Sequence, residues 1–148
     1  MLASLAWWAA VGQARPSRAM VCAIAGWRVT SGHVKNVAGA LRTKGLIGYP
    51  SDGRVELTAA GEAVAEAPDD LGRSIPDYVR ETLSGPQAQV FDELLRRPAG
   101  LDRGALCEAI GWNSTSGHVK NVLGSMRSME IVEYPTQGSV KLVDWIMQ

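Results

Sequence analysis

The sequence has few cysteines and histidines, and this shortage excludes two classes of small protein. Only two cysteines, Cys22 and Cys107, occur among 148 residues, so the chain cannot build a disulfide scaffold. Their spacing matches no metal-binding pattern, and the two histidines are just as widely separated. We therefore expect both cysteines to be small buried side chains, and we expect no metal site and no cofactor.

An excess of one charge sign is also missing, because 15 Lys and Arg residues balance 15 Asp and Glu residues. A protein that held nucleic acid by charge alone would be clearly basic. The balance hides an asymmetry: residues 1–67 hold seven basic and four acidic residues (+3), and residues 68–148 hold eight and eleven (−3). The protein must therefore bind a polyanion through local contacts, or through only one half of the chain.

Signatures of catalysis and of membrane targeting are absent as well. The sequence shows no nucleophile–base pair at a recognisable spacing and no phosphate-binding loop. We therefore expect no catalytic residue and no enzyme activity. The apolar start, MLASLAWWAAV, has no basic segment and is far shorter than a membrane span. We interpret it as the first helix of a cytoplasmic protein that has no membrane partner.

What the sequence does contain is a repeat. An offset of 85 residues aligns positions 1–63 with 86–148 without a gap, and about a third of the pairs are identical. The longest shared stretch is TSGHVKNV, at 30–37 and again at 115–122. Because 85 residues is too long for a solenoid period, we predict two small domains, at 1–67 and 86–148, joined by a linker at 68–85. Further identical pairs are Arg18/Arg103, Cys22/Cys107, Gly26/Gly111, Trp27/Trp112, Gly39/Gly124, Arg42/Arg127 and Tyr49/Tyr134.

Local rules predict the same elements in each copy. Apolar spacing in the second copy predicts helices at 85–97, 103–110 and 116–129, capped by Asp102 and by Thr115 or Ser116. Strands at 131–134 and 140–143 follow, joined by a tight turn. The first copy has the same order and continues into an apolar helix at 62–67. In the linker, Pro76 predicts a short helix over 77–83, which we expect to pack between the copies.

Three helices followed by a β-hairpin is the order of winged helix-turn-helix domains, and the sequence is similar to that family in detail. The segments LDRGALCEAIGW…TSGHVKNVLGSMRSMEIVEYP and LRTKGLIGYPSDGRVELTAAG resemble its second helix, turn, recognition helix and wing. The resemblance covers nearly all of both copies. It implies a mainly α fold with small β-hairpins (α+β), built from tandem winged helix-turn-helix domains. Similar units occur in transcription regulators and in larger bacterial assemblies, where some bind protein instead.

The third helix of each copy carries the candidate contacts to DNA. Its apolar side buries Val34, Val37, Ala38 and Leu41 in the first copy, and its polar side would face the major groove. Asparagine can pair with adenine, Lys or Arg with guanine or phosphate, and the helix N-terminus with phosphate. The candidate DNA-binding residues are Thr30, Ser31, His33, Lys35, Asn36, Arg42 and Arg54, and in the second copy Thr115, Ser116, His118, Lys120, Asn121 and Arg127.

The two copies differ at their predicted wings. Asp52-Gly53-Arg54 gives the first wing a basic tip, which resembles the family's phosphate-contacting arginine, whereas the second wing has Gln137-Gly138-Ser139. Arg28 and Lys44 also lack a basic counterpart in the second copy. We therefore expect the first copy to hold DNA more tightly.

Several residues on the third helix have two interpretations. Ser31 is expected to cap the helix whatever else it does, and His33 can be a solvated residue on its flank. Gly39, repeated as Gly124, costs about 1 kcal/mol in a helix relative to alanine. Its presence in both copies indicates close approach of the backbone, either to another helix or to DNA.

The tryptophans also leave alternatives open. Trp7 or Trp8 can fill the space that alanines leave in the first helix, or one of them is exposed and marks a protein interface or self-association through that helix. We expect Trp27 and Trp112, at the turn before the third helix, to close the core.

Two functions follow from these residues. The first is a sequence-preferring double-stranded DNA-binding protein, a regulator of transcription or an accessory in DNA processing, which the set Lys35, Asn36, Arg42 and Arg54 favours. The second is a protein–protein interaction module, or an appended domain of a larger bacterial assembly, which the balanced charge favours.

Overall fold

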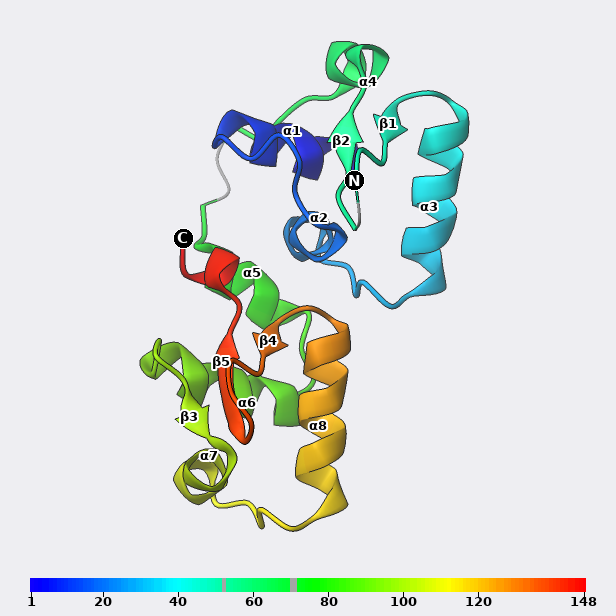
Figure 1. Cartoon of the computed structure of the whole chain (residues 1–148). Coiled ribbons are helices and arrows are strands. Elements are labelled where there is room, and N and C mark those ends of the chain that lie inside the picture. Colours follow the sequence, from blue (N-terminus) through cyan, green and yellow to red (C-terminus); the bar gives the residue numbers. More distant parts are fainter. Residues whose placement is uncertain (52, 70–71) are drawn as a thin grey trace. The chain divides into compact units, whose positions relative to one another are not determined.

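The computed structural model describes residues 1–51, 53–69 and 72–148 (Figure 1). Asp52, in the predicted first wing, and Asp70 and Leu71, in the predicted linker, lie outside the described residues. The described chain is a mixed α+β structure with two small antiparallel sheets. It forms two compact units, Met1–Ser74 and Ile75–Gln148.

The first unit consists of three helices, a hairpin and a last short helix. The hairpin is antiparallel, with Ile47 opposite Leu57, and α1 packs against α2 and β2. Its elements are α1 (Leu2–Ala10), α2 (Arg18–Ala25), α3 (Gly32–Thr43), β1 (Ile47–Gly48), β2 (Glu56–Leu57) and α4 (Ala59–Val64).

The second unit repeats this order and adds to it. The helices α7 and α8 and the strand β4 lie 85 residues after α2, α3 and β1, so the repeat in the sequence is also a repeat of secondary structure. The elements are α5 (Ile75–Glu81), α6 (Gly85–Arg96), β3 (Leu101–Asp102), α7 (Arg103–Ile110), α8 (Gly117–Ser128), β4 (Val132–Glu133), β5 (Ser139–Leu142) and the 3-10 helix η1 (Asp144–Met147).

Local caps place the helix boundaries close to where the sequence predicts them. The Asp102 carboxylate accepts a hydrogen bond from the Ala105 N–H at 2.9 Å, which begins α7 at the predicted residue. Ser31 Oγ accepts from the Val34 N–H at 3.3 Å and begins α3. Ser116 precedes α8 in the same extended conformation, but its side chain makes no capping hydrogen bond among the described residues.

Each unit has its own apolar core. In the first unit the indole of Trp8 is 1% exposed, and its Nε1–H donates to the Met20 carbonyl at 2.9 Å. Trp8 therefore fills the space that the alanines leave, and its assignment to a protein interface is wrong. Trp7 is half-buried and lies edge-on to Trp8, with ring centroids 4.8 Å apart. Phe91, Leu94, Leu106, Met126 and Ile146 are the largest members of the second core, and Cys22 and Cys107 are buried as predicted.

Several features of the secondary structure differ from the prediction. Helix α4 begins at Ala59 rather than residue 62, because Thr58 Oγ1 accepts a hydrogen bond from the Gly61 N–H at 3.1 Å. The strand β3 is too short to show a sequence pattern and exists because it pairs with β5, with Leu101 opposite Val140. In the first unit its counterpart is a single bridge between Ser17 and Arg54.

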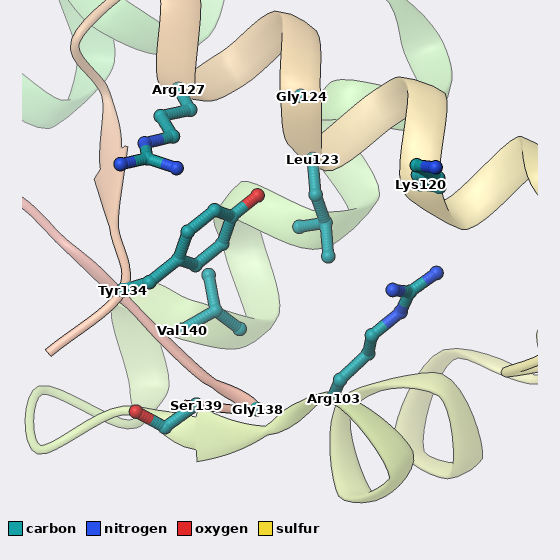
Figure 2. A pocket seen from close by; sticks show the side chains of 9 residues that line it. All are labelled: Arg103, Lys120, Leu123, Gly124, Arg127, Tyr134, Gly138, Ser139 and Val140. Carbon is teal, nitrogen blue, oxygen red and sulfur yellow. The ribbon is translucent and has the colours of Figure 1, made fainter. Parts of the chain in front are cut away.

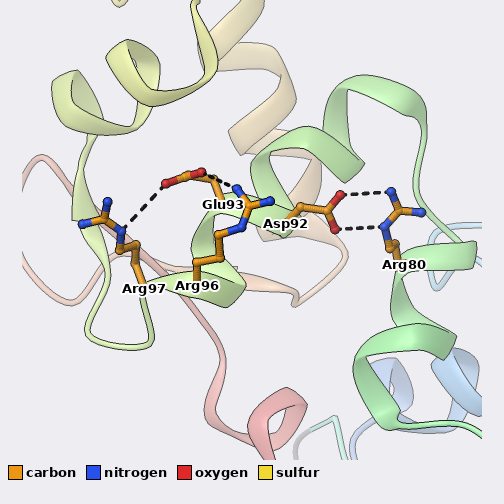
Figure 3. Close-up of polar contacts among 5 residues, drawn as sticks. All are labelled: Arg80, Asp92, Glu93, Arg96 and Arg97. Atoms are coloured by element: carbon orange, nitrogen blue, oxygen red, sulfur yellow. Dashed lines mark hydrogen bonds and ion pairs between the residues drawn. The ribbon is translucent and has the colours of Figure 1, made fainter.

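The linker helix predicted over 77–83 is α5, which instead runs from Ile75 to Glu81 and belongs to the second unit. It packs against η1 and buries Ile75 and Val79. Its Arg80 guanidinium donates two hydrogen bonds to Asp92 of α6, at 2.9 and 3.0 Å, which fixes α5 against α6 (Figure 3). Among the described residues, no helix combines the length and apolar character that crossing a membrane requires.

Candidate nucleic-acid interface

In each unit a groove lies between the third helix and the β-hairpin. The second groove has a volume of about 370 Å³, and Figure 2 shows its lining side chains. The first groove has a larger volume, about 640 Å³. The first groove is lined by Arg18, Lys35, Ala38, Gly39, Arg42, Tyr49, Ser51 and Gly53. The second groove is lined by Arg103, Lys120, Leu123, Gly124, Arg127, Tyr134, Gly138, Ser139 and Val140.

Most of the residues that line the two grooves correspond and are identical. The shared pairs comprise three cations, a tyrosine and two glycines, each pair 85 residues apart. Gly53 and Gly138 have a positive φ, so the hairpin turn accounts for them, but the cations and the tyrosine contribute little to an apolar core. The shared pairs are Arg18/Arg103, Lys35/Lys120, Gly39/Gly124, Arg42/Arg127, Tyr49/Tyr134 and Gly53/Gly138.

One cation in each groove stacks on the groove's own tyrosine. The Arg42 guanidinium carbon lies 5.1 Å from the centre of the Tyr49 ring, and that of Arg127 lies 4.9 Å from the centre of the Tyr134 ring. Attraction between the cation and the ring face restrains the long arginine side chain. A restrained guanidinium loses less entropy when its N–H groups bind an anion.

A second cation enters each groove from the beginning of the second helix. The backbone N–H of Arg18 donates to the Gly53 carbonyl at 3.2 Å, and that of Arg103 donates to the Gly138 carbonyl at 2.8 Å. These bonds tie the beginning of α2 and of α7 to the turn of the hairpin. Each arginine therefore lines the same groove as a lysine of the third helix, although the two residues are far apart in the sequence.

The outward side of the third helix is as the sequence predicts. Lys35, Asn36 and Arg42 are exposed, and so are their counterparts Lys120, Asn121 and Arg127. On the opposite side of α3, Val34 and Ala38 are buried, whereas Val37 and Leu41 are half-buried. The lysine, asparagine and arginine therefore share one solvent-facing surface in each unit.

Gly39 and Gly124, the two glycines within the third helices, pack against no other described residue of their own unit. A Cβ added to Gly39 or Gly124 would meet no atom within 4 Å outside the helix's own backbone, and both residues are exposed. Close helix–helix packing is therefore the wrong explanation for these glycines. The remaining alternative is close approach by a partner outside the chain.

A tryptophan–histidine pair flanks the third helix in each unit. The ring centroids of Trp27 and His33 are 4.7 Å apart at 80°, and those of Trp112 and His118 are 4.7 Å apart at 54°. Both histidines are exposed and both tryptophans are half-buried. Each half-buried indole lies against an exposed imidazole at the helix's first turn, and the expectation that these tryptophans close the core stays a prediction.

The other predicted site residues lie outside the grooves. Ser31 caps α3, and Thr30 is exposed ahead of it. Thr115 donates to Asn113 Oδ1 through its N–H at 3.0 Å and its hydroxyl at 2.8 Å. The Arg54 side chain is exposed and donates to the Arg15 carbonyl at 3.4 Å. Arg54 therefore lies beside the first groove and not in its lining.

Sequence reasoning missed the arginines and tyrosines that complete the grooves. Arg18, Tyr49 and their counterparts were visible as identical pairs, but they lie outside the third helix, on which the prediction concentrated. Identity between copies at polar positions was the signal that could have found them. The chain matches no family model, and no curated protein or solved structure matches it significantly.

Proposed function

We propose that this protein binds double-stranded DNA through two tandem winged helix-turn-helix domains, with α3 and α8 as recognition helices and the hairpins as wings. The observation that carries the proposal is the placement of the repeated residues. The repeated cations, asparagines and tyrosines, which the cores do not use, gather in each unit at the groove and on the outward side of the third helix. The need to form the same core explains why buried residues such as Val34 and Cys22 occur in both copies. It does not explain why the exposed residues Lys35, Asn36 and Arg42 do so.

The chemistry of this surface suits a duplex. Arg18, Lys35 and Arg42 make no ion pair with another described residue, so each is available to a phosphate. Asn36, one residue from Lys35, can donate to and accept from an adenine edge in the major groove. Because these contacts are local, a net charge of zero does not prevent binding.

Titration of the full chain with labelled mixed-sequence duplex DNA, followed by fluorescence anisotropy at two salt concentrations, tests the proposal. Binding should weaken steeply as salt rises, because each phosphate contact releases counterions. A chain that leaves the anisotropy unchanged even at low salt does not bind DNA. In that case the protein-interaction module becomes the better proposal.

Replacing Asn36 and Asn121 with alanine should lower DNA affinity by about 1–3 kcal/mol and relax the preference at a base pair. Thermal melting should stay nearly unchanged, because both side chains are exposed and lie away from the buried valines. Affinity for preferred and mixed duplexes, measured beside the melting curve, separates the two effects. A double variant that binds every duplex as the parent does would refute base reading by these residues.

Replacing Gly39 and Gly124 with alanine should affect stability and binding in opposite directions. Each change should raise the free energy of unfolding by about 0.5–1 kcal/mol, because alanine is the better helix former and nothing obstructs its Cβ. DNA affinity should fall, because the added methyl groups stand where the duplex approaches. Gly85→Ala, at the beginning of α6 and also unobstructed, is the control and should leave affinity unchanged. Unaltered DNA binding in the double variant would show that the glycines do not face the duplex.

A further inference from the structure

Most cations of the second unit are neutralised by ion pairs. Lys141 pairs with Asp144 at 3.0 Å and Glu133 at 3.1 Å, and these hydrogen bonds raise the pKa of its ammonium group. Three further pairs involve side chains of α5, of α6 and of Arg97, the residue after α6, and are drawn in Figure 3. They are Arg80–Asp92 at 2.9 Å, Arg96–Glu93 at 3.1 Å and Arg97–Glu93 at 3.8 Å.

The three cations left over all line the second groove. Residues 75–148 hold seven Lys and Arg, four of which are in the ion pairs above. Arg103, Lys120 and Arg127 make no ion pair with any other described residue. The unit also holds nine Asp and Glu, so its formal charge is 7 − 9 = −2. The cations that have no ion-pair partner among the described residues thus all lie in one pocket of a unit whose net charge is negative.

The basic residues that the second copy lacks are the ones outside the groove. Arg15, Arg28, Lys44 and Arg54 are absent from the lining of the first groove, and their counterparts are Gly100, Asn113, Met129 and Ser139. An extended polyanion gains from cations spread over a surface. Of the basic residues in the first copy, the second copy keeps only those that line the groove. This pattern suits a small anion that binds inside the groove.

The second groove also has a smaller volume than the first, and its lining is more apolar. Leu123 replaces Ala38 on the helix side, and Leu123 and Val140 point into the space from opposite walls (Figure 2). The Tyr134 ring forms one side, with 38% of the residue exposed. A volume of about 370 Å³ lies in the range of about 300–1,000 Å³ typical of small-molecule sites.

One donor in this pocket has no partner. Figure 2 shows Arg103 rising from α7 into the space below α8, and its Nε is buried with no hydrogen-bond partner among the described residues. A buried N–H without an acceptor is destabilising, and native proteins rarely retain one. An anion in the groove would supply that acceptor.

We propose that the second groove binds a small organic phosphate of nucleotide size, such as a nucleoside monophosphate. Its phosphate accepts hydrogen bonds from Arg103 and Lys120, and its flat ring lies on Leu123 and Val140 beside Tyr134. This ligand is distinct from the DNA of the proposed function. A phosphodiester of DNA shares the phosphate chemistry, so the experiment must separate the two sources.

Adenosine 5′-monophosphate and inorganic phosphate are the probes, each titrated into the full chain and followed by saturation-transfer NMR. The nucleotide should bind with a Kd below about 1 mM, and phosphate alone at least about tenfold more weakly, because it lacks the apolar contacts. Arg103→Ala should weaken nucleotide binding about tenfold or more. Arg18→Ala, the matched change in the first groove, should leave it unchanged.

Leu123→Ala places alanine in the second groove, as Ala38 is in the first, and tests the contribution of the apolar contact between Leu123 and the ring of the nucleotide. It should weaken the nucleotide about fivefold and leave inorganic phosphate unaffected. Binding of duplex DNA is measured in the same variants, so that this proposal and the proposed function are tested separately. The protein can bind DNA without binding the nucleotide, and it can bind the nucleotide without binding DNA. Absence of nucleotide binding, or equal losses from Arg18→Ala and Arg103→Ala, would overturn the proposal. Circular dichroism melting of each variant confirms that it folds.

Discussion

Duplex DNA affinity should fall about 100-fold when Arg18, Lys35 and Arg42 are replaced together by alanine. Each side chain lines the first groove and has no ion-pair partner among the described residues, so each replacement removes a phosphate contact worth about 1 kcal/mol or more. The slope of log K against log salt should shrink by about three units, one for each lost contact. Anisotropy titrations at several salt concentrations measure both quantities.

The matched control is the same change in the second groove, at Arg103, Lys120 and Arg127. We expect a smaller loss of DNA affinity there, because the second unit carries a net negative charge and lacks the cations outside its groove. Melting curves should remain close to that of the parent in both variants, since the replaced cations contribute to the grooves and not to the cores. Equal losses of affinity would show that the two units bind DNA equally well and that the charge asymmetry between them does not affect DNA affinity.

Gly61→Ala should lower the free energy of unfolding of the first unit by about 3 kcal/mol. A Cβ at residue 61 would lie 1.9 Å from the Leu46 carbonyl oxygen and 2.9 Å from its carbon, and backbone atoms cannot move aside as a flexible side chain can. The clash falls where α4 is anchored, because the Thr58 N–H donates to the same Leu46 carbonyl at 3.1 Å. Urea denaturation followed by circular dichroism and tryptophan fluorescence gives the change in free energy.

Gly39→Ala is the control for this experiment, because it makes the same chemical change in the same unit. It has open space at its Cβ and should raise stability slightly instead of lowering it. A Gly61→Ala chain as stable as the parent would mean that α4 is not held against the end of α3 and the strand that follows. The opposite signs expected for two glycines depend on the space around each, which their positions in the sequence do not reveal.

The helices could be predicted because their signals are short-range. An N-cap acts over three residues, as Asp102 does on Ala105, and an apolar side recurs every three or four residues, as Val34 and Ala38 show. The repeat made every such signal visible twice. Errors arose where the deciding contact came from elsewhere in the chain: β3 exists only through its pairing with β5, and α5 is held by Asp92 of the next helix.

The outward surface of the third helix followed from the sequence for the same reason. Side chains one helical turn apart must share a face, so Lys35, Asn36 and Gly39 were identified before any fold was known. The tryptophans show the limit of this reasoning. Periodicity placed Trp7 and Trp8 on the first helix, but only the packing of α1 against α2 decides that Trp8 is buried with its Nε1–H on the Met20 carbonyl.

By itself, the sequence determined the repeat, the order of the helices and the polar surface of α3 and α8. Only the tertiary structure decided that each surface ends in a groove. Arg18 lines the same groove as Lys35 because its backbone N–H donates to the Gly53 carbonyl, which joins segments 35 residues apart, and the ring of Tyr49 contacts the guanidinium of Arg42. Such a site depends on where three elements meet in space, and no signal that acts over a few residues carries that information.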